Sequence, residues 1–203
     1  MKLRYSPTSP YVRKVMVVAL ETGLEGKLDK IETSVAPTKP NTDVAKVNPL
    51  MKVPALALDN GETLFDSPVI CEYLDSLHGG AKMFPPAGPA RWTALRRQAL
   101  ADGILDAAVL NRYELAVRPE QYRWPDWTAG QMAKVKGALD ALESEADKLG
   151  ATVDIGTITI GCALGYLDFR YADLGWRQDR PKLAKWYEGF AARPSMLATV
   201  PKA

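Results

Sequence analysis

The stretch Arg4–Leu20, "RYSPTSPYVRKVMVVAL", decides how the first half of this chain folds. It follows directly from a predicted strand over residues 1–6 and passes through a turn rich in hydroxyl groups and proline. Ser9 followed by Pro10 is typical of a helix start, with serine as the N-cap and proline in the first turn. Apolar residues then recur at spacings of three and four, which predicts a helix over residues 10–22. The question is whether Ser9 only caps this helix or also belongs to an active site.

Strands and helices continue to alternate up to about residue 78. "KLDKIET" (27–33) predicts a second strand, and "PALAL" (54–58) and "ETLF" (62–65) predict a hairpin closed by an Asn-Gly turn. Ser67 before Pro68 predicts another helix start. This order of elements is that of a thioredoxin-like domain. We expect its parallel strand pair in the middle of the sheet and an antiparallel pair at the end of the domain.

The second half of the chain has a different pattern. Residues 79–89, "GGAKMFPPAGP", form a glycine- and proline-rich linker, after which strand signals disappear. Helical periodicity then covers four segments: 90–118, 128–149, 155–174 and 180–193. We therefore predict a thioredoxin-like domain over 1–78, a linker over 79–89 and an all-helical domain over 90–203.

Composition excludes several classes of function. The chain has 26 Lys and Arg against 24 Asp and Glu without a basic run, so nucleic-acid binding is not expected. It has no apolar run of membrane-spanning length and no apolar leader, so we expect a cytoplasmic protein. His78 is the only histidine, and Cys71 and Cys162 lie within apolar helical patterns, so we expect no metal site.

Four motifs now point to a family: "SPYVRKV" from Ser9, "NPLMKVPAL" from Asn48, "FDSPVICEYL" from Phe65 and "DIGTITIGCALGYL" from Asp154. With this division into two domains, the chain resembles cytosolic glutathione transferases over essentially its whole length. Within the family it is most similar to a bacterial serine-type branch with a "TSP(F/Y)VRK" start. The resemblance implies glutathione as co-substrate, no metal, a small electrophile as second substrate, and a homodimer.

The resemblance also implies which residues bind glutathione. Val53-Pro54 would be a cis peptide, and the N–H and C=O of Val53 would pair with the cysteinyl part of glutathione like an added strand. Met51 stands where many relatives have glycine. Lys52 would pair with the glycyl carboxylate, and Lys39 is a second candidate for that contact.

Two helix starts complete the set of motifs. Ser67, as the cap of its helix, would bind the γ-glutamyl carboxylate at the positive helix end, and Asp66 would take the γ-glutamyl ammonium. Asp154 would cap the helix of the last motif, with Thr157 at its third position. Because relatives usually have the hydroxyl first and the acid second, we expect a weakened reciprocal capping box there.

Thiol activation requires only a modest free energy. A free thiol with a pKa of about 8.5 is only about 3% thiolate at pH 7, and lowering that pKa by two units takes about 2.7 kcal/mol. One hydroxyl hydrogen bond to an anion contributes roughly 1.5–3 kcal/mol, and a helix start about 0.3–1 more. The resemblance selects Ser9 for this catalytic role. Counting from other classes would select Ser6, with Thr8 beside it, or Tyr5.

The predicted function is that of a glutathione S-transferase, whose thiolate attacks an electrophile or reduces a peroxide. Tyr11, Arg112 and Tyr113 are candidates for the second-substrate pocket. The alternative is a glutathione-binding or non-catalytic regulatory module of the same fold. A glutaredoxin-like redox role is disfavoured because serine cannot form a mixed disulfide and no cysteine stands at the first helix.

Overall fold

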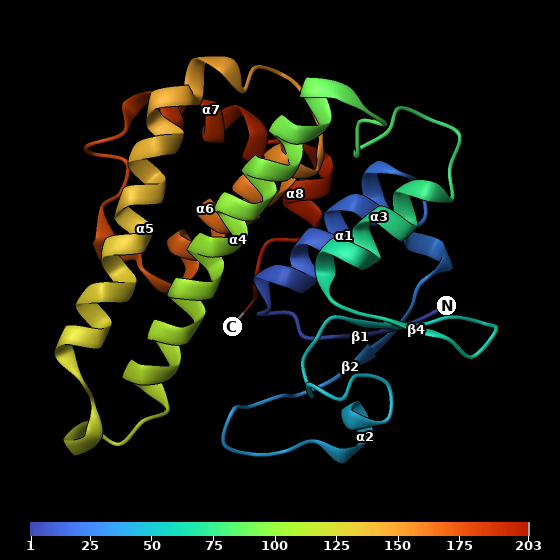
Figure 1. Cartoon of the computed structure of the whole chain (residues 1–203), viewed down its shortest axis with the longest axis horizontal. Coiled ribbons are helices and arrows are strands. Elements are labelled where there is room, and N and C mark those ends of the chain that lie inside the picture. The colour runs from blue at the N-terminus through green and yellow to red at the C-terminus, as the bar shows by residue number, and fades with distance from the viewer. Residues whose placement is uncertain (203) are drawn as a thin grey trace. The chain divides into compact units, whose positions relative to one another are not determined.

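The computed structural model describes residues 1–202 as two compact units. The first unit consists of Met1–Pro86 together with the segment that begins at Pro194, and the second unit is Ala87–Arg193. The thioredoxin-like and helical classes predicted from the sequence are both present (Figure 1). The sequence prediction ended the last helical pattern at Pro194, whereas the structure has a short further helix there, α8 (Pro194–Ala198), which packs on α1 (Pro10–Glu21) within the first unit.

The sheet of the first unit has the strand order β2-β1-β3-β4. Its strands are β1 (Lys2–Tyr5), β2 (Asp29–Glu32), β3 (Ala55–Ala57) and β4 (Thr63–Leu64). β1 and β2 are parallel, while β3 runs antiparallel to both β1 and β4. Our placement of the parallel pair in the middle of the sheet was therefore wrong. The α1 crossover puts β2 at one edge, and the hairpin joins the opposite side of β1.

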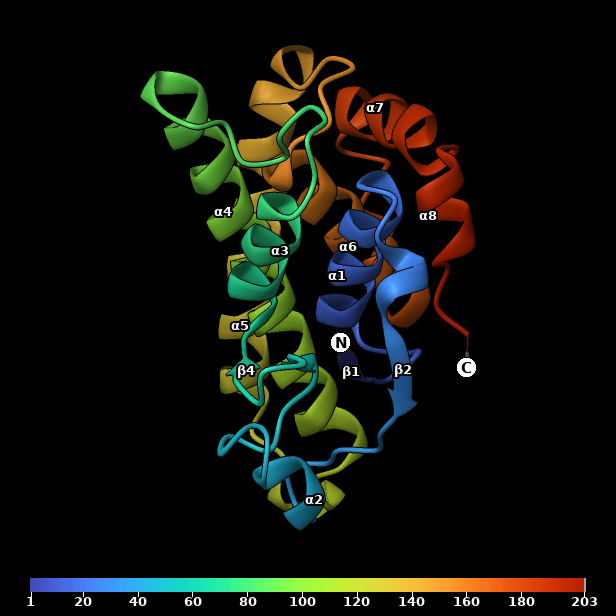
Figure 2. The same ribbon diagram turned by 90° about the vertical axis from the view of Figure 1, so that its right-hand side faces the viewer.

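Helices cover both faces of this sheet. α1 and α3 (Ser67–Ser76) lie on one face and pack on each other, and α2 (Thr42–Ala45) lies beyond the other face (Figures 1 and 2). Between α1 and β2 the chain makes one 3-10 turn, η1 (Glu25–Lys27). Leu3, Leu56 and Ile70 are fully buried between the sheet and the two helices. Burial of apolar surface therefore holds both helices on this face of the sheet.

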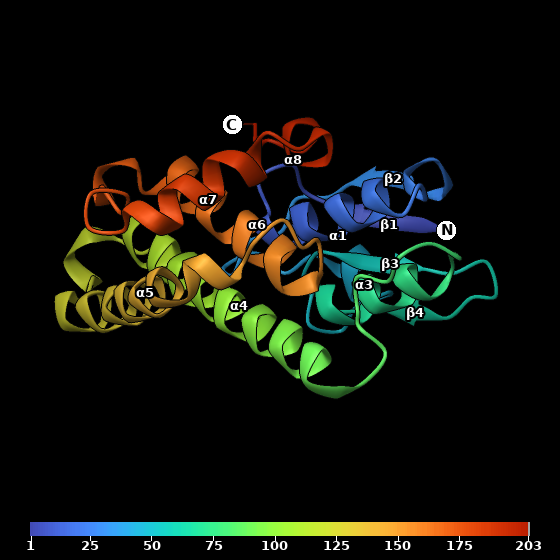
Figure 3. The same ribbon diagram turned by 90° about the horizontal axis from the view of Figure 1, so that it is seen from above.

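The second unit is entirely helical. Its α-helices are α4 (Gly88–Ala116), α5 (Pro125–Glu145), α6 (Ile155–Arg170) and α7 (Pro181–Ala191), with 3-10 turns η2 (Glu120–Tyr122), η3 (Ala146–Lys148) and η4 (Ala172–Leu174). α4 packs against both α5 and α6, and α6 is buried along most of its length (Figure 3). Among the described residues, no helix combines the length and apolar character needed to cross a bilayer.

The start of α6 differs from the prediction. The Thr157 N–H donates to Asp154 Oδ1 at 2.9 Å, and the Asp154 N–H donates to Thr157 Oγ1 at 3.0 Å. The reciprocal capping box is thus complete, and the expectation of a weakened box was wrong. A threonine hydroxyl at the third position accepts the N-cap N–H as well as a Glu or Gln side chain would.

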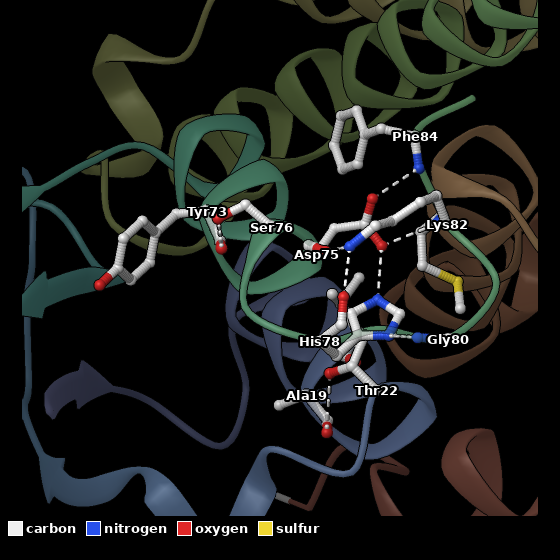
Figure 4. A network of polar contacts seen from close by, with 11 residues as sticks. Ala19, Thr22, Tyr73, Asp75, Ser76, His78, Gly80, Lys82 and Phe84 are labelled. Carbon is white, nitrogen blue, oxygen red and sulfur yellow. Dashed lines mark hydrogen bonds and ion pairs between the residues drawn. The ribbon is translucent and has the colours of Figure 1, made fainter. Parts of the chain in front are cut away.

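The only histidine of the chain holds the end of α3 to the segment that follows it (Figure 4). The buried Asp75 carboxylate accepts hydrogen bonds from the Met83 N–H at 2.8 Å and the Phe84 N–H at 3.1 Å. His78 Nε2 lies 2.9 Å from the same carboxylate, and Nδ1 accepts from the Gly80 N–H at 3.0 Å. Because Nδ1 is an acceptor, the ring proton is on Nε2, and His78 serves this linker.

Candidate functional site

Strand register brings the predicted binding segments to one end of the sheet. Arg4 pairs with Ala55, so the turn after β1 lies beside the residues that precede β3. Leu56 pairs with Leu64, so the residues after β4 lie at the same end. The segments that converge there are Ser6–Ser9, Val53–Pro54 and Asp66–Ser67.

The Val53-Pro54 peptide bond is cis, as predicted. Val53 is 8% exposed, and no hydrogen bond among the described residues uses its backbone N–H or C=O. Asn48 fixes the loop before it, donating from Nδ2 to the Lys52 carbonyl at 3.0 Å and accepting from the Leu50 N–H at 3.0 Å. Backbone groups away from water are nearly always paired. The unpaired N–H and C=O of Val53 are therefore suited to pair with a ligand that has an extended, strand-like backbone.

The side chains around this loop are less constrained. Met51 has a φ of 53°, in the left-handed region that glycine adopts most readily, so this chain keeps the loop shape without the glycine. Lys52 and Lys39 are both exposed, and no ion pair formed by either side chain occurs among residues 1–202. Each ammonium is therefore available to a carboxylate of a ligand.

The start of α3 is one residue earlier than predicted. The helix begins at Ser67, and Asp66 occupies the N-cap position without a side-chain cap hydrogen bond. Ser67 therefore does not cap the helix as expected. Its hydroxyl is buried, with the residue 1% exposed, and has no hydrogen-bond partner among the described residues. An unpaired hydroxyl and an exposed carboxylate thus lie at a helix N-terminus, where anions are favoured.

Ser9 is the N-cap of α1, as predicted. Its Oγ accepts from the Val12 N–H at 3.3 Å, and the first turn of α1 contains no acidic residue. A hydroxyl that accepts one hydrogen bond still has its own proton to donate, so capping and donation to an anion are compatible. The Ser6 and Thr8 hydroxyls lie 3.3 Å apart and hydrogen-bond to each other.

Comparison with known proteins decides the family. A family model for the N-terminal domain of glutathione S-transferases matches residues 8–77, and one for the C-terminal domain matches residues 125–189. The uncharacterized GST-like protein YibF of Escherichia coli (strain K12) is 38% identical over 99% of this chain and 98% of its own length. This chain belongs to the glutathione S-transferase family.

Solved structures of the family agree with this assignment. A glutathione transferase family member from Pseudomonas fluorescens Pf-5, solved with bound glutathione, is 50% identical to this chain. It superposes with a TM-score of 0.98 over 100% of this chain and 99% of its own. A glutathione S-transferase from Methylobacillus flagellatus, also with glutathione bound, is 39% identical with a TM-score of 0.88, covering 99% of each chain.

Of two cavities in this family member, one is lined by residues of the predicted site and the other is not. One, of about 330 Å³, lies within the first unit and is lined by Tyr5, Ser6 and Ser9 among others. The other, of about 460 Å³, lies in the second unit between Leu115 and Ala129. None of the predicted site residues lines the larger cavity.

The candidates for the second substrate lie in different units. Tyr11 is a half-buried residue in the first turn of α1, and Arg112 and Tyr113 lie on α4. Burial raises the pKa of Tyr113, and burial together with the neighbouring Tyr171 raises the pKa of Tyr166 to about 12. These phenols are hydrogen-bond donors at neutral pH. Tyr171 lies beside α4, where its hydroxyl donates to the Ala108 carbonyl at 2.7 Å and accepts from Asn111 Nδ2 at 3.2 Å.

Proposed function

We propose that this protein is a serine-type glutathione transferase that binds glutathione in its first unit and holds the thiol as a thiolate for attack on an electrophile or peroxide. The observation that carries the proposal is the unpaired backbone of Val53 beside a cis proline. Its N–H and C=O would pair with the backbone of the cysteinyl residue, which places the thiol near the turn after β1.

The remaining contacts follow from the charges of glutathione. The γ-glutamyl carboxylate would bind the Ser67 hydroxyl and the free N–H groups at the start of α3, and Asp66 would bind the γ-glutamyl ammonium. Lys52 would pair with the glycyl carboxylate, with Lys39 as the second candidate. The unpaired buried hydroxyl of Ser67 supports this arrangement, because a buried hydroxyl without a partner is otherwise costly.

Ser9 would stabilise the thiolate. Its Oγ already accepts the Val12 N–H, which leaves its proton to point at an anion at the positive end of α1. Ser6 and Thr8 hydrogen-bond to each other, so only one of these two hydroxyls keeps a proton to donate, and neither is the N-cap of α1. Tyr5 stays a further alternative.

A relative supports conjugation rather than binding alone. The Pseudomonas fluorescens Pf-5 protein has also been solved with S-(propanoic acid)-glutathione, at 50% identity and a TM-score of 0.93. That molecule is a thioether of glutathione, the kind of product that thiolate attack on an electrophile leaves. We propose the same class of reaction for this chain.

The test is the pH dependence of thiolate absorbance of glutathione bound to the wild type, Ser9→Ala and Ser6→Ala. We expect a bound-thiol pKa of about 6.5 in the wild type and in Ser6→Ala, returning toward about 8.5 in Ser9→Ala. A low pKa that persists in Ser9→Ala but not in Ser6→Ala would move the role to Ser6. If titration calorimetry detected no binding at millimolar glutathione, the proposed function would fail.

We also propose a cytoplasmic homodimer, as in the family. Leu50 and Val69 of the first unit are 61% and 45% exposed, and the proposed interface would cover apolar side chains such as these. Sedimentation should give twice the chain mass of 22.2 kDa. A monomer at the concentrations used for activity would contradict this part of the proposal.

A further inference from the structure

The cavity beside Ser9 has a lining of one charge sign. It is formed entirely within the first unit, from the turn after β1, α1, β2 and the chain after α8. In Figure 2 the chain after α8 descends on the same side of α1 as β2. The charged side chains in the lining are Arg13, Lys30 and Lys202, and no acidic side chain lines it among the described residues. Such a lining favours an anionic guest.

Arg13 is the buried member of this set. It is 7% exposed, and its Nη2 and Nε donate to the Met196 carbonyl at 3.1 Å and to Thr199 Oγ1 at 3.4 Å. Both acceptors are neutral, and within residues 1–202 no carboxylate forms an ion pair with Arg13. A buried guanidinium without a counter-charge attracts an anion that enters the cavity.

The two lysines stand at the exposed part of the lining. Lys202 is exposed and has no ion pair among the described residues. Lys30 pairs with Glu25 at 2.7 Å on the surface, so an incoming carboxylate would share its ammonium with Glu25. Met16 and Val12 provide apolar contact for the rest of the guest, and Ser9 contributes to the same lining.

We propose that this cavity is the acceptor subsite of the enzyme and that it selects electrophiles carrying a carboxylate. The inference rests on the proposed function, because it places the acceptor next to the hydroxyl that would hold the thiolate. It adds a carboxylate to the small electrophile that the resemblance implies, and it places that electrophile in a cavity that Tyr11, Arg112 and Tyr113 do not line. The cavity volume of about 330 Å³ is sufficient for a substituted benzoate or a short-chain carboxylic acid.

The reaction step is a substitution on such an acceptor. The glutathione thiolate forms a bond from sulfur to the carbon that carries a halide, and the carbon–halogen bond breaks with its electron pair leaving as halide. The thiol proton goes to solvent when the thiolate forms. No oxidant or reductant is needed, and the carboxylate of the acceptor stays unchanged in the thioether product.

The test compares 4-chloro-3-nitrobenzoate with its neutral amide, 4-chloro-3-nitrobenzamide. For each, kcat/KM is divided by the uncatalysed rate with glutathione, which removes the difference in intrinsic reactivity. We expect the enzyme to prefer the benzoate, and we expect Lys30→Gln combined with Lys202→Gln to lower that preference on the order of fivefold to tenfold. Glu25→Gln should raise it, because it frees the Lys30 ammonium.

The matched control is Lys27→Gln, which removes an exposed lysine that does not line the cavity. It should leave the preference unchanged, and the KM for glutathione should stay constant in all these variants. Turnover of both electrophiles without preference for the benzoate, or a preference that the lysine variants do not change, would overturn the inference while leaving the proposed function standing. Absence of turnover and of glutathione binding would instead remove the proposed function itself.

Discussion

At the scale of single residues, the Ser67 hydroxyl contributes little to the stability of the fold. Its Oγ is buried without a hydrogen-bond partner among the described residues, so it gives up interactions with water without a return from the protein. Ser67→Ala should therefore leave the free energy of unfolding unchanged or raise it by up to about 1 kcal/mol. The same change should weaken glutathione binding about tenfold. Urea denaturation and titration calorimetry measure the two effects separately.

Ser76 offers the matched control for this prediction. Its Oγ donates to the Tyr73 carbonyl at 2.6 Å near the other end of α3, far along the helix from the proposed carboxylate site. Ser76→Ala should change stability by less than about 1 kcal/mol, because the lost exposed hydrogen bond is offset by the better helix propensity of alanine, and it should leave glutathione affinity unchanged. A Ser67→Ala protein that is less stable but binds glutathione normally would mean that the hydroxyl has only a structural role.

At the scale of elements, the contact between α4 and α6 depends on a residue without a side chain. A Cβ built on Gly156 would lie 2.7 Å from both the Ala94 carbonyl oxygen and the Arg97 Cβ. Because these contacts involve backbone and a Cβ atom, they cannot be relieved by turning a side chain. Gly156→Ala should therefore lower the free energy of unfolding by about 1–3 kcal/mol. Chemical denaturation measures the change.

A second glycine separates this clash from helix propensity. Gly137 lies in the exposed interior of α5, and a Cβ built there meets no atom within 4 Å. Gly137→Ala should stabilise the protein by about 0.5–1 kcal/mol, because alanine loses less backbone entropy than glycine in a helix. If both substitutions were stabilising, close packing at Gly156 would be ruled out as the determinant.

The end of α3 depends on a carboxylate rather than on the histidine beside it. Asp75 accepts two backbone N–H groups of the following segment as well as His78 Nε2. Asp75→Ala would leave those buried donors unpaired and should cost about 3 kcal/mol of stability. His78→Ala removes one of the three contacts and should cost about 1 kcal/mol. Equal losses, measured by denaturant unfolding, would show that Asp75 acts only through His78.

At the scale of the whole molecule, features that depend on neighbouring residues could be predicted from the sequence better than features that depend on distant segments. The Ser9-Pro10 step fixed the start of α1 because a cap depends on residues next to one another. The position of β1 between β2 and β3 depends on pairing between distant segments, and the prediction failed there. The last helix, α8, was missed because five residues are too few for helical periodicity, and only packing on α1 stabilises it.

The candidate site shows the same division. The cis bond before Pro54 was predicted from a motif that can be recognised in the sequence, and the structure confirms it. A second motif predicted a helix start at Ser67, where α3 begins, although Asp66 rather than Ser67 is the N-cap. The cationic cavity could not be predicted, because Arg13, Lys30 and Lys202 are far apart in the sequence and meet only in the folded first unit. Charge clusters of this kind become visible only when register and packing are known.

Acid should weaken the protein through carboxylates whose pKa values are lowered by folding. Burial alone would raise the pKa of Glu145, but its hydrogen bonds and charge interactions with Arg96 and Arg97 outweigh burial and hold the pKa below its ordinary value of 4.5. A hydrogen bond from the Trp124 N–H, followed by the effect of Arg118, lowers the pKa of Glu114.

A lowered pKa in the folded state means that the unfolded state binds protons first as the pH falls. These groups therefore stabilise the fold fully above about pH 4.5, and that stabilisation is lost as the pH falls through their folded pKa values. The melting temperature should be nearly constant from pH 7 to about pH 5 and fall below it. Glu145→Gln should lower the melting temperature at pH 7 and flatten this fall, because a glutamine amide does not titrate. A fall equally steep in Glu145→Gln would show that the acid sensitivity arises from other carboxylates.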